Sequence, residues 1–244
     1  MKTYKEKTNT NDCQKFLSKI SYLNSEEIKD FFELSELPPQ MIKAKFYDND
    51  FPPEYHSLEN PKNKKPLIKK NDIVWKRLED YFDLFSSSLF VFKKFKVGEI
   101  SKIYQGAFSK NAYLLNAFGF LQLYNKKYIE RLFLTDKYNL YGCYGVILNY
   151  NGEWCVVNLD DFFPFMKSKN QLLFSRSEKN EIWLMLLEKA YAKLYGSYEN
   201  IQNGSVLDAV CDLTGVSYDI VNESSFPSEE ERIKKIILFH DLSR

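Results

Sequence analysis

Four cysteines and two histidines are the residues of this sequence best suited to nucleophilic or metal chemistry. The cysteines are scattered and form no Cys-x-x-Cys pair, so their spacing argues against a zinc site and against a disulfide framework. We interpret the cysteines as small buried hydrophobic residues of a reducing compartment, and we predict no cofactor. The six residues are Cys13, Cys143, Cys155, Cys211, His56 and His240.

Composition argues against nucleic-acid and membrane functions. Lys+Arg number 34 and Asp+Glu 33, a formal net charge of +1, so no overall field attracts nucleic acid or an anionic membrane. The basic run Lys62–Lys70 could bind phosphate, but its proline content and its lack of Arg favour a solvated loop. The longest apolar run, Ile182–Leu187, is too short to span a bilayer, and the polar residues Met1–Asp12 lack the apolar core of a signal peptide. We therefore expect an intracellular protein.

Apolar periodicity predicts the elements that would position these residues. Helical spacing over Ile73–Phe85 predicts one helix. Residues Asn111–Leu123 are almost continuously apolar, which predicts a helix buried on all sides at the centre of the domain. Alternation across Tyr144–Val157, with Asn151-Gly152 as a type I′ turn, predicts a β-hairpin.

Capping residues predict the other helices, and the order of elements then indicates the fold class. Helices come first, a small sheet follows, and further helices end the chain, which is typical of an α+β fold dominated by helix. Polar N-caps, Pro stops and Gly at the helix ends mark the boundaries. The candidates run from Ser25 to Pro38-Pro39, from Ser177 to Gly196, from Ser205 to Gly215, and onward from the capping box of Ser228 and Glu231, with Ile233, Ile236, Ile237 and His240 on one stripe.

One long run carries a resemblance to a known family. Residues Trp183–Glu199 read WLMLLEKAYAKLYGSYE, which resembles the calpain protease core, where Trp precedes Leu-Leu-Glu-Lys-Ala-Tyr-Ala-Lys and then Gly-x-Tyr. The resemblance implies the first, nucleophile-bearing subdomain of a papain-like core, with a central buried helix and a small antiparallel hairpin. Further matches over residues 46–240 are Phe46–Pro53 with Ser57-Leu58, Trp75-x-Arg77 as the first core helix, Gln105–Ala107, Gly152–Trp154 with Asp160-Asp161-x-x-Pro164, and Asp212–Gly215.

The nucleophile position departs from the family pattern. A papain-like protease needs its thiol at the amino end of the central helix, where the helix dipole and an imidazolium favour the thiolate. Calpains have Gln-Gly, two residues, then Gly-Asp-Cys-Trp-Leu-Leu. Aligning Tyr113–Leu115 with Trp-Leu-Leu puts Ala112 at the Cys and requires one extra residue after Gln105, whereas a gapless alignment puts Asn111 there. Neither residue can form an acyl-enzyme, so Gln105, which matches the oxyanion glutamine, is vestigial.

Two further departures concern the catalytic base and calcium. In the family the catalytic His and Asn lie in a second subdomain, in Gly-His-Ala-Tyr and Asn-Pro-Trp-Gly stretches that this sequence lacks. We interpret His56 and His240 as surface or interface residues rather than replacement bases. An acidic residue of a calcium-binding loop in the family aligns with Lys102, whose cation repels Ca²⁺ and offers no oxygen ligand. We therefore expect no calcium site.

These readings combine into one prediction of organisation and function. We expect a polar N-terminal tail over residues 1–24 and a calpain-like core subdomain over 25–244, with an irregular Pro-rich segment at 46–70 and no second subdomain. The predicted function is a catalytically inactive pseudo-peptidase that binds protein partners in a larger assembly. The alternatives are a cysteine endopeptidase subunit, or a regulatory decoy, completed by a partner chain. Richness in Lys, Asn, Tyr and Phe is typical of protists with AT-rich genomes, whose cilia contain calpain-like domains, so a cytoskeletal or ciliary location also fits.

Overall fold

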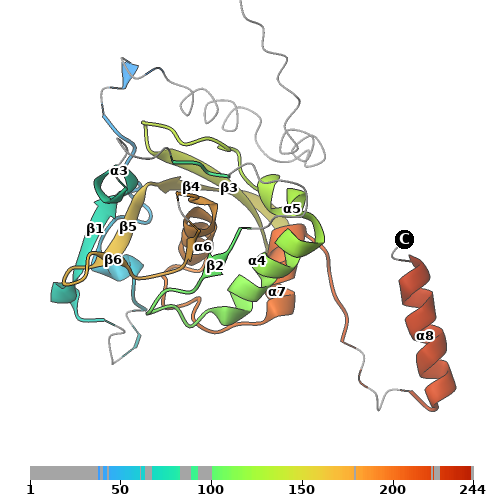
Figure 1. The fold of residues 1–244 in the computed structure, drawn as a ribbon. Helices are drawn as coiled ribbons and strands as arrows, with labels where there is room; N and C mark the ends of the chain where they lie inside the picture. The colour runs from blue at the N-terminus through green and yellow to red at the C-terminus, as the bar shows by residue number, and fades with distance from the viewer. Residues whose placement is uncertain are drawn as a thin grey trace, which may run out of the picture.

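A computed structural model describes residues 38, 41–42, 44–60, 62–63, 68–82, 89–92, 101–178, 180–220, 222 and 226–242. The predicted tail, the predicted helix at Ser25 and Cys13 lie outside these residues. Small antiparallel sheets surround one buried helix, and further helices lie to one side (Figure 1). Among the described residues, no helix is long and apolar enough to cross a membrane.

The first sheet corrects one predicted helix. Its strand order is β1-β5-β6, all antiparallel, with β1 at Ile73–Arg77, β5 at Phe162–Met166 and β6 at Gln171–Leu172. The helix predicted over 73–85 is therefore wrong at its start, and only α3, Leu78–Tyr81, is helical among its described residues. Residues 73–77 form a strand because they pair with β5, which is distant in sequence. The spacing of apolar residues inside the segment cannot reveal such a partner. Trp75-x-Arg77 accordingly belongs to an edge strand rather than to a core helix.

The predicted hairpin is confirmed. Strands β3, Cys143–Tyr150, and β4, Glu153–Asp160, pair along eight residues each. Asn151 and Gly152 have φ of 53° and 88°, as a type I′ turn requires. A third sheet pairs β2, Ile103–Tyr104, with β7, Arg176–Ser177. Because strands contribute this much, the α+β class is confirmed but the predicted dominance of helix is not.

Helix α4 confirms the predicted element but not its complete burial. It spans Ala112–Asn125 and is followed by α5 at Lys127–Glu130. The side chains of Phe120, Leu123 and Tyr124 are 56%, 69% and 72% exposed. Helices α5 and α7 pack against α4, so one of its faces stays open to solvent. The prediction of a helix buried on all sides, which rested on its apolar composition, is therefore wrong for the face that carries these three residues.

Helix α6 is the central helix of the fold. It spans Trp183–Leu194, and every residue from Trp183 to Ala192 is buried. Figure 1 shows α6 enclosed by the sheets, and it contacts β3, β4 and β7. The predicted N-cap Ser177 is wrong, because Ser177 pairs in β7 and the helix begins after Ile182 without a side-chain cap. Its predicted end is confirmed, since Gly196 has φ of 94° just beyond it.

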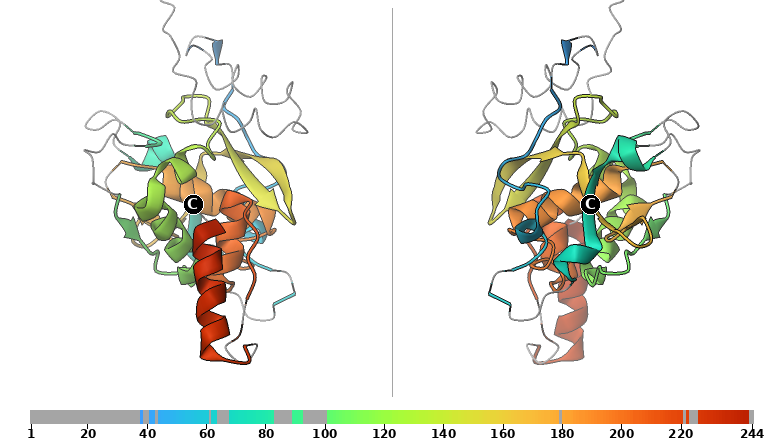
Figure 2. Two further views of the ribbon diagram at one scale, coloured as in Figure 1. Left: turned by 90° about the vertical axis from the view of Figure 1, so that its right-hand side faces the viewer. Right: turned by 90° about the vertical axis from the view of Figure 1, so that its left-hand side faces the viewer.

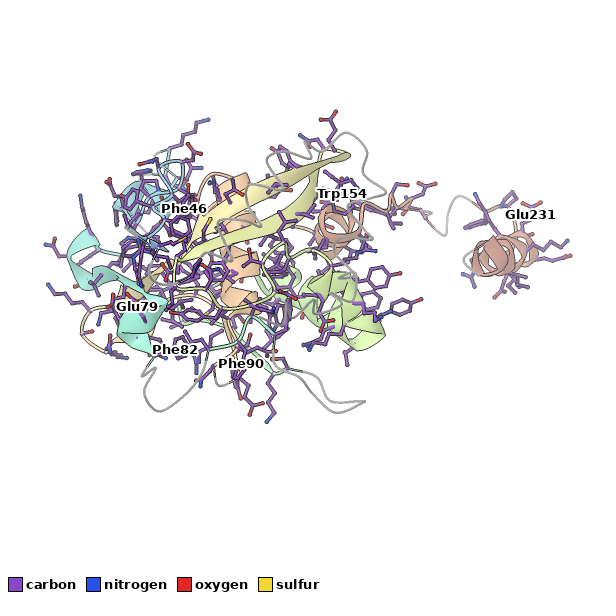
Figure 3. The ribbon with its side chains drawn as sticks, turned by 90° about the horizontal axis from the view of Figure 1, so that it is seen from above. Phe46, Glu79, Phe82, Phe90, Trp154 and Glu231 are labelled. Carbon is purple, nitrogen blue, oxygen red and sulfur yellow. The ribbon has the colours of Figure 1, made fainter. Side chains whose placement is uncertain are left out.

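Helix α7 has the boundaries that its capping residues predict. It spans Val206–Thr214, and the Ser205 hydroxyl accepts hydrogen bonds from the backbone of its first turn. Gly215 ends the helix with φ of 72°, a left-handed conformation that favours glycine. A Cβ at Gly215 would come within 2.6 Å of the Trp154 ring. Trp154, labelled in Figure 3, therefore holds the hairpin against the end of α7.

Helix α8, Glu229–Leu242, follows the predicted capping residue. The backbone N–H of Glu231 donates to the Ser228 hydroxyl at 3.3 Å, which is one half of the predicted capping box. Figures 1 and 3 show α8 standing apart from the other elements, and the side views of Figure 2 show it extending below them. Ile233 and Ile237 are 48% and 54% exposed, so the described part of the predicted stripe faces solvent.

Candidate functional site at the amino end of helix α4

The resemblance places the nucleophile of a papain-like enzyme at the amino end of α4. Ala112 is the first residue of α4 and its side chain is exposed, whereas the preceding Asn111 is fully buried. The loop before the helix approaches its neighbours closely, because a Cβ at Gly106 would meet the Phe174 backbone at 2.3 Å. A hydrogen bond from the Lys110 N–H to the Gln202 side chain, 2.5 Å long, holds the loop further.

Below this helix end lies a buried carboxylate that sequence reasoning missed. Glu188 of α6 is 1% exposed. Its Oε1 accepts from Asn111 Nδ2 at 2.7 Å, and its Oε2 accepts from the Ser175 N–H at 2.8 Å. The hydroxyls of Ser175 and Ser109 also donate to Oε1, at 2.9 and 3.3 Å. The sequence showed Glu188 only as one charged residue, beside Lys189, of a mostly apolar run, and neither Asn111 nor Ser175 could be recognised as its partner.

Electrostatics explains why an amide suits position 111. Burial raises the pKa of Glu188, and hydrogen bonds from Asn111, Ser175 and Ser109 oppose that shift. In the alignment that puts Ala112 at the Cys, the calpain pattern has Asp at the residue matched by Asn111. A second carboxylate beside Glu188 would repel it, whereas the Asn111 amide donates a hydrogen bond. The Asn111 amide therefore links the start of α4 to α6.

The side chain of Gln105, the predicted oxyanion residue, is also engaged in a hydrogen bond within the protein. Gln105 Nε2 donates to the backbone carbonyl of Ser109 at 2.6 Å. The Ser109 hydroxyl is buried and hydrogen-bonded to the side chains of Asn111 and Glu188. Gln105 thus contacts the loop that leads into α4, and Asn111 and Ala112 follow at the start of that helix. The hydroxyls of Ser109 and Ser175 are both hydrogen-bonded to the Glu188 carboxylate.

The described cysteines lie on other elements. Cys143 is in β3, Cys155 in β4 and Cys211 in α7, and all three are free thiols. Burial, assisted by the carboxylates of Asp48 and Asp160, raises the pKa of Cys143 to about 12. Burial likewise raises the pKa values of Cys155 and Cys211. These environments favour the protonated thiol, which is the unreactive form.

Calcium, which the resemblance implies, does not fit the residues that are present. The Lys102 side chain is 67% exposed, with Nζ 3.8 Å from the Glu178 carboxylate. At the position that the resemblance assigns to a calcium ligand, the chain thus has an ammonium group, which offers no oxygen. Within the described part of the chain, no group of three or more His, Cys, Asp or Glu could hold a metal ion.

The two histidines lie on other parts of the fold. His56 is at the surface, with Nδ1 3.6 Å from Glu54, so it keeps its interpretation as a surface residue. His240 belongs to α8 and its side chain lies outside the described residues. Its interpretation stays a prediction.

The comparison with known sequences identifies the class of protein. The model of the calpain family of cysteine proteases matches residues 46–243. The chain therefore belongs to the calpain family, and this region is its protease core. The resemblance of Trp183–Glu199 is thereby confirmed.

Individual relatives agree with this assignment. The chain is 36% identical over 180 residues to "Calpain-type cysteine protease DEK1" of Zea mays, a match that covers 70% of the chain and 8% of the relative. It is 34% identical over 180 residues to the Arabidopsis thaliana protein of the same name, with the same coverage. A shorter match, 41% identical over 92 residues, covers 37% of the chain and 14% of "Calpain-5" of Caenorhabditis elegans. The chain thus spans less than a tenth of the length of its plant relatives.

Proposed function

We propose that this calpain-family domain does not cleave peptides and serves instead as a folded binding subunit of a larger protein assembly. The observation that carries the proposal is Ala112 at the exposed first position of α4. A methyl group cannot attack a carbonyl carbon, and the adjacent Asn111 is bound to Glu188. Nucleophilic catalysis needs a thiol or hydroxyl at this helix end, with a base in reach.

The competing function is peptide cleavage, which the word "protease" in the names of the relatives favours. Among the described thiols, Cys143 is the most buried, and its pKa is about 12. At pH 7 a thiol with such a pKa is ionised in about one molecule in 10⁵. A partner chain that completed the site, for a peptidase subunit or for a decoy, would have to supply the nucleophile as well as the base.

Peptidase assays test the catalytic part of this proposal. The purified protein is incubated with a fluorogenic calpain peptide and calcium, beside the variant Cys143→Ala. We expect both proteins to release the fluorophore at the rate of buffer alone. Turnover above buffer that a thiol-directed inhibitor blocks would show the proposal to be wrong, and loss of that turnover in Cys143→Ala would identify the thiol responsible.

Size-exclusion chromatography of native cell extract tests the assembly part. We expect the tagged protein to elute with a large complex and to be recovered with a fixed set of partners in stoichiometric amounts. Elution at the mass of the free chain would contradict a subunit role. Recovery of many unrelated peptides in substoichiometric amounts would instead support the regulatory decoy.

A further inference from the structure

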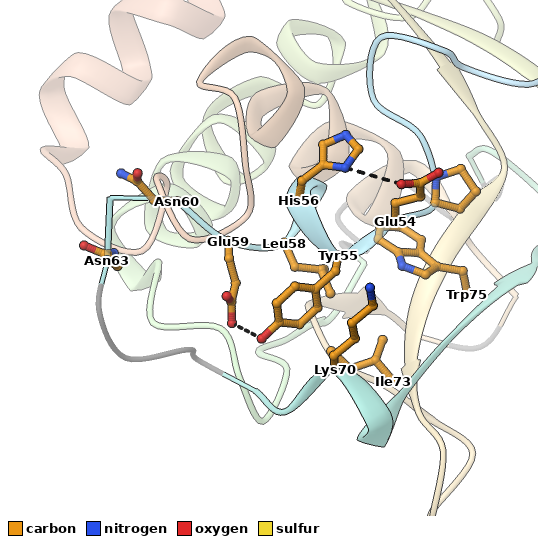
Figure 4. Close-up of a pocket in the computed structure, with 11 residues that line it drawn as sticks. Glu54, Tyr55, His56, Leu58, Glu59, Asn60, Asn63, Lys70, Ile73 and Trp75 are labelled. Atoms are coloured by element: carbon orange, nitrogen blue, oxygen red, sulfur yellow. Dashed lines mark hydrogen bonds and ion pairs between the residues drawn. The ribbon is translucent and has the colours of Figure 1, made fainter.

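A pocket of about 660 Å³ lies beside the three-stranded sheet, on elements other than the amino end of α4 (Figure 4). One part of its wall is apolar and comes from the Pro-rich segment and from β1. The other part carries charged side chains of both signs. The apolar residues are Pro53, Leu58, Ile73 and Trp75, and the charged or titratable ones are Glu54, His56, Glu59 and Lys70.

Strand β1 forms the edge of this sheet. Within the described residues β1 pairs with β5 alone. The Asp72 carbonyl accepts from the Lys167 N–H at 2.8 Å, and the Leu78 N–H donates to the Asp161 carbonyl at 3.2 Å. Since backbone groups alternate in direction along a strand, the even-numbered residues of β1 bond to β5 and the odd-numbered residues point outward.

The outward backbone groups belong to the same residues that line the pocket. The Ile73 N–H bonds to the Lys70 carbonyl, which leaves the Ile73 carbonyl and both polar groups of Trp75 directed away from β5. The side chains of Ile73 and Trp75 line the pocket. A strand that paired with this edge would place the residue opposite Trp75 with its side chain on the pocket side, because paired residues share a face.

Charge and ring chemistry indicate which side chain this position suits. The Tyr55 hydroxyl donates to Glu59 at 2.5 Å, so the carboxylate of Glu59 lies at the edge of the Tyr55 ring. Burial raises the pKa of Tyr55 to about 12, and the carboxylates of Glu59 and Glu199 contribute to the shift. The ammonium group of Lys70 also lies near this ring, with Nζ 6.0 Å from its centre. The pocket thus holds two carboxylates, Glu54 and Glu59, against one ammonium group. A guanidinium can stack on Tyr or Trp and pair with a carboxylate at the same time, which an ammonium does less well.

We propose that the open edge of β1 and this pocket together bind an extended segment of a partner protein, which adds as a strand along β1 and places an arginine in the pocket. Pairing through the backbone supplies affinity, and the pocket selects the side chain. This inference does not depend on the absence of peptidase activity, which is tested separately.

Binding is tested with the acetylated and amidated peptide Val-Thr-Arg-Val-Thr and the ¹⁵N-labelled protein. The indole N–H resonance of Trp75, assigned with the variant Trp75→Phe, reports on the pocket. We expect it to shift in a saturable way and the amide of Trp75 to shift with it. Glu in place of Arg in the peptide, or Glu54→Gln with Glu59→Gln in the protein, should weaken binding by roughly tenfold, since charge-assisted pairs are lost. The exposed Glu153→Gln on the hairpin is the matched control and should leave binding unchanged.

Backbone methylation of the peptide tests strand pairing without altering the protein. The added strand runs antiparallel to β1, so the Arg opposite Trp75 exchanges both backbone hydrogen bonds with it. An N-methyl group on the Arg removes the N–H that would bond to the Trp75 carbonyl, so binding should be lost. The same group on the preceding Thr points away from β1 and should change affinity less than about threefold. Equal binding by the two methylated peptides would overturn strand addition, and equal binding by the Arg and Glu peptides would overturn arginine recognition. No shift of Trp75 at millimolar peptide would overturn the site altogether.

Discussion

At the scale of single residues, Glu188 holds the amino end of α4 in place through its hydrogen bond from Asn111. Its two carboxylate oxygens face N–H donors, one from Asn111 and one from Ser175. In Glu188→Gln an amide nitrogen must face one of these donors, so we expect the free energy of unfolding to fall by about 1–3 kcal/mol. Chemical denaturation measures the loss. Glu178→Gln, whose carboxylate is partly exposed and 3.8 Å from Lys102, is the control and should cost less than about 0.5 kcal/mol.

The same substitution has a pH dependence of known sign. Burial raises the pKa of Glu188 above its value in the unfolded chain, which is about 4.3. Between the two values the native state binds more protons, so the stabilising contribution of this group is present at low pH and declines as pH rises through the folded-state pKa. Because Gln does not titrate, the destabilisation by Glu188→Gln should be larger at pH 5 than at pH 8. A loss that grew with pH would contradict the direction of the shift.

Thiol reactivity provides a second prediction at this scale. Cys143 is 2% exposed and its pKa is about 12, so we expect iodoacetamide to leave it unmodified in the native protein at pH 8 and to modify it after denaturation. In Ala112→Cys the new thiol is exposed at a helix amino end, which lowers a thiol pKa. We expect peptide mass spectrometry to show that this thiol reacts at least about tenfold faster than Cys143. Faster alkylation of Cys143 in the native protein would disprove the assigned environment.

At the scale of elements, substitutions at two glycines distinguish the cost of backbone strain from the cost of disturbing the packing of the hairpin on α7. Gly152 and Gly215 both have positive φ, 88° and 72°, so Ala costs about 1–2 kcal/mol of strain at either position. A Cβ at Gly152 meets nothing within 4 Å, whereas one at Gly215 meets Trp154 at 2.6 Å. Gly215→Ala should therefore lower the free energy of unfolding by a further 1–3 kcal/mol or so. Equal losses in thermal denaturation would mean that the hairpin does not pack on α7 in this way.

Elements with a local signal could be predicted from the sequence. The turn at Asn151-Gly152 and the caps Ser205 and Gly215 lie within a few residues of the structure they specify, and each is confirmed. Strand β1 could not be predicted, because its partner β5 is distant in sequence and both strand and helix tolerate its residues. Ser177 failed for the same reason, since pairing with β2 took precedence over capping.

Of the candidate site, too, the sequence located only the residues with a local signal. The resemblance located Gln105, Asn111 and Ala112, because these residues are adjacent in sequence and follow a known pattern. The role of Glu188 could not be found in this way, because its hydrogen bonds join α6 to Asn111, 77 residues earlier, and to Ser175, the residue before β7. The buried network that fills the space beneath the helix end is a property of the folded chain.

At the scale of the whole molecule, the run of strongest resemblance to calpains is a structural element. Along α6, Glu188 holds the start of α4, and Lys189 is buried against Asp160 and the Phe162 carbonyl. Lys193 pairs with Asp48 at 2.8 Å, and the Tyr191 hydroxyl bonds to Asp212 of α7. One helix thus fixes four separate parts of the fold. A chain can keep this run for stability alone, so family membership by itself says little about catalysis.

Calcium provides the last prediction, because it concerns the response of the whole domain. If Ca²⁺ bound the native state with tenfold excess over its dissociation constant, the free energy of unfolding would rise by about 1.4 kcal/mol, and Tm by several degrees. Lys102 and the absence of an acidic cluster among the described residues argue against such a site. We therefore expect Tm in 1 mM CaCl₂ to lie within about 1 °C of Tm in a chelator, with MgCl₂ at equal ionic strength as the control. A saturable rise specific to Ca²⁺ would show that backbone carbonyls or residues outside the described ranges supply the ligands, and would reopen calcium activation for this domain.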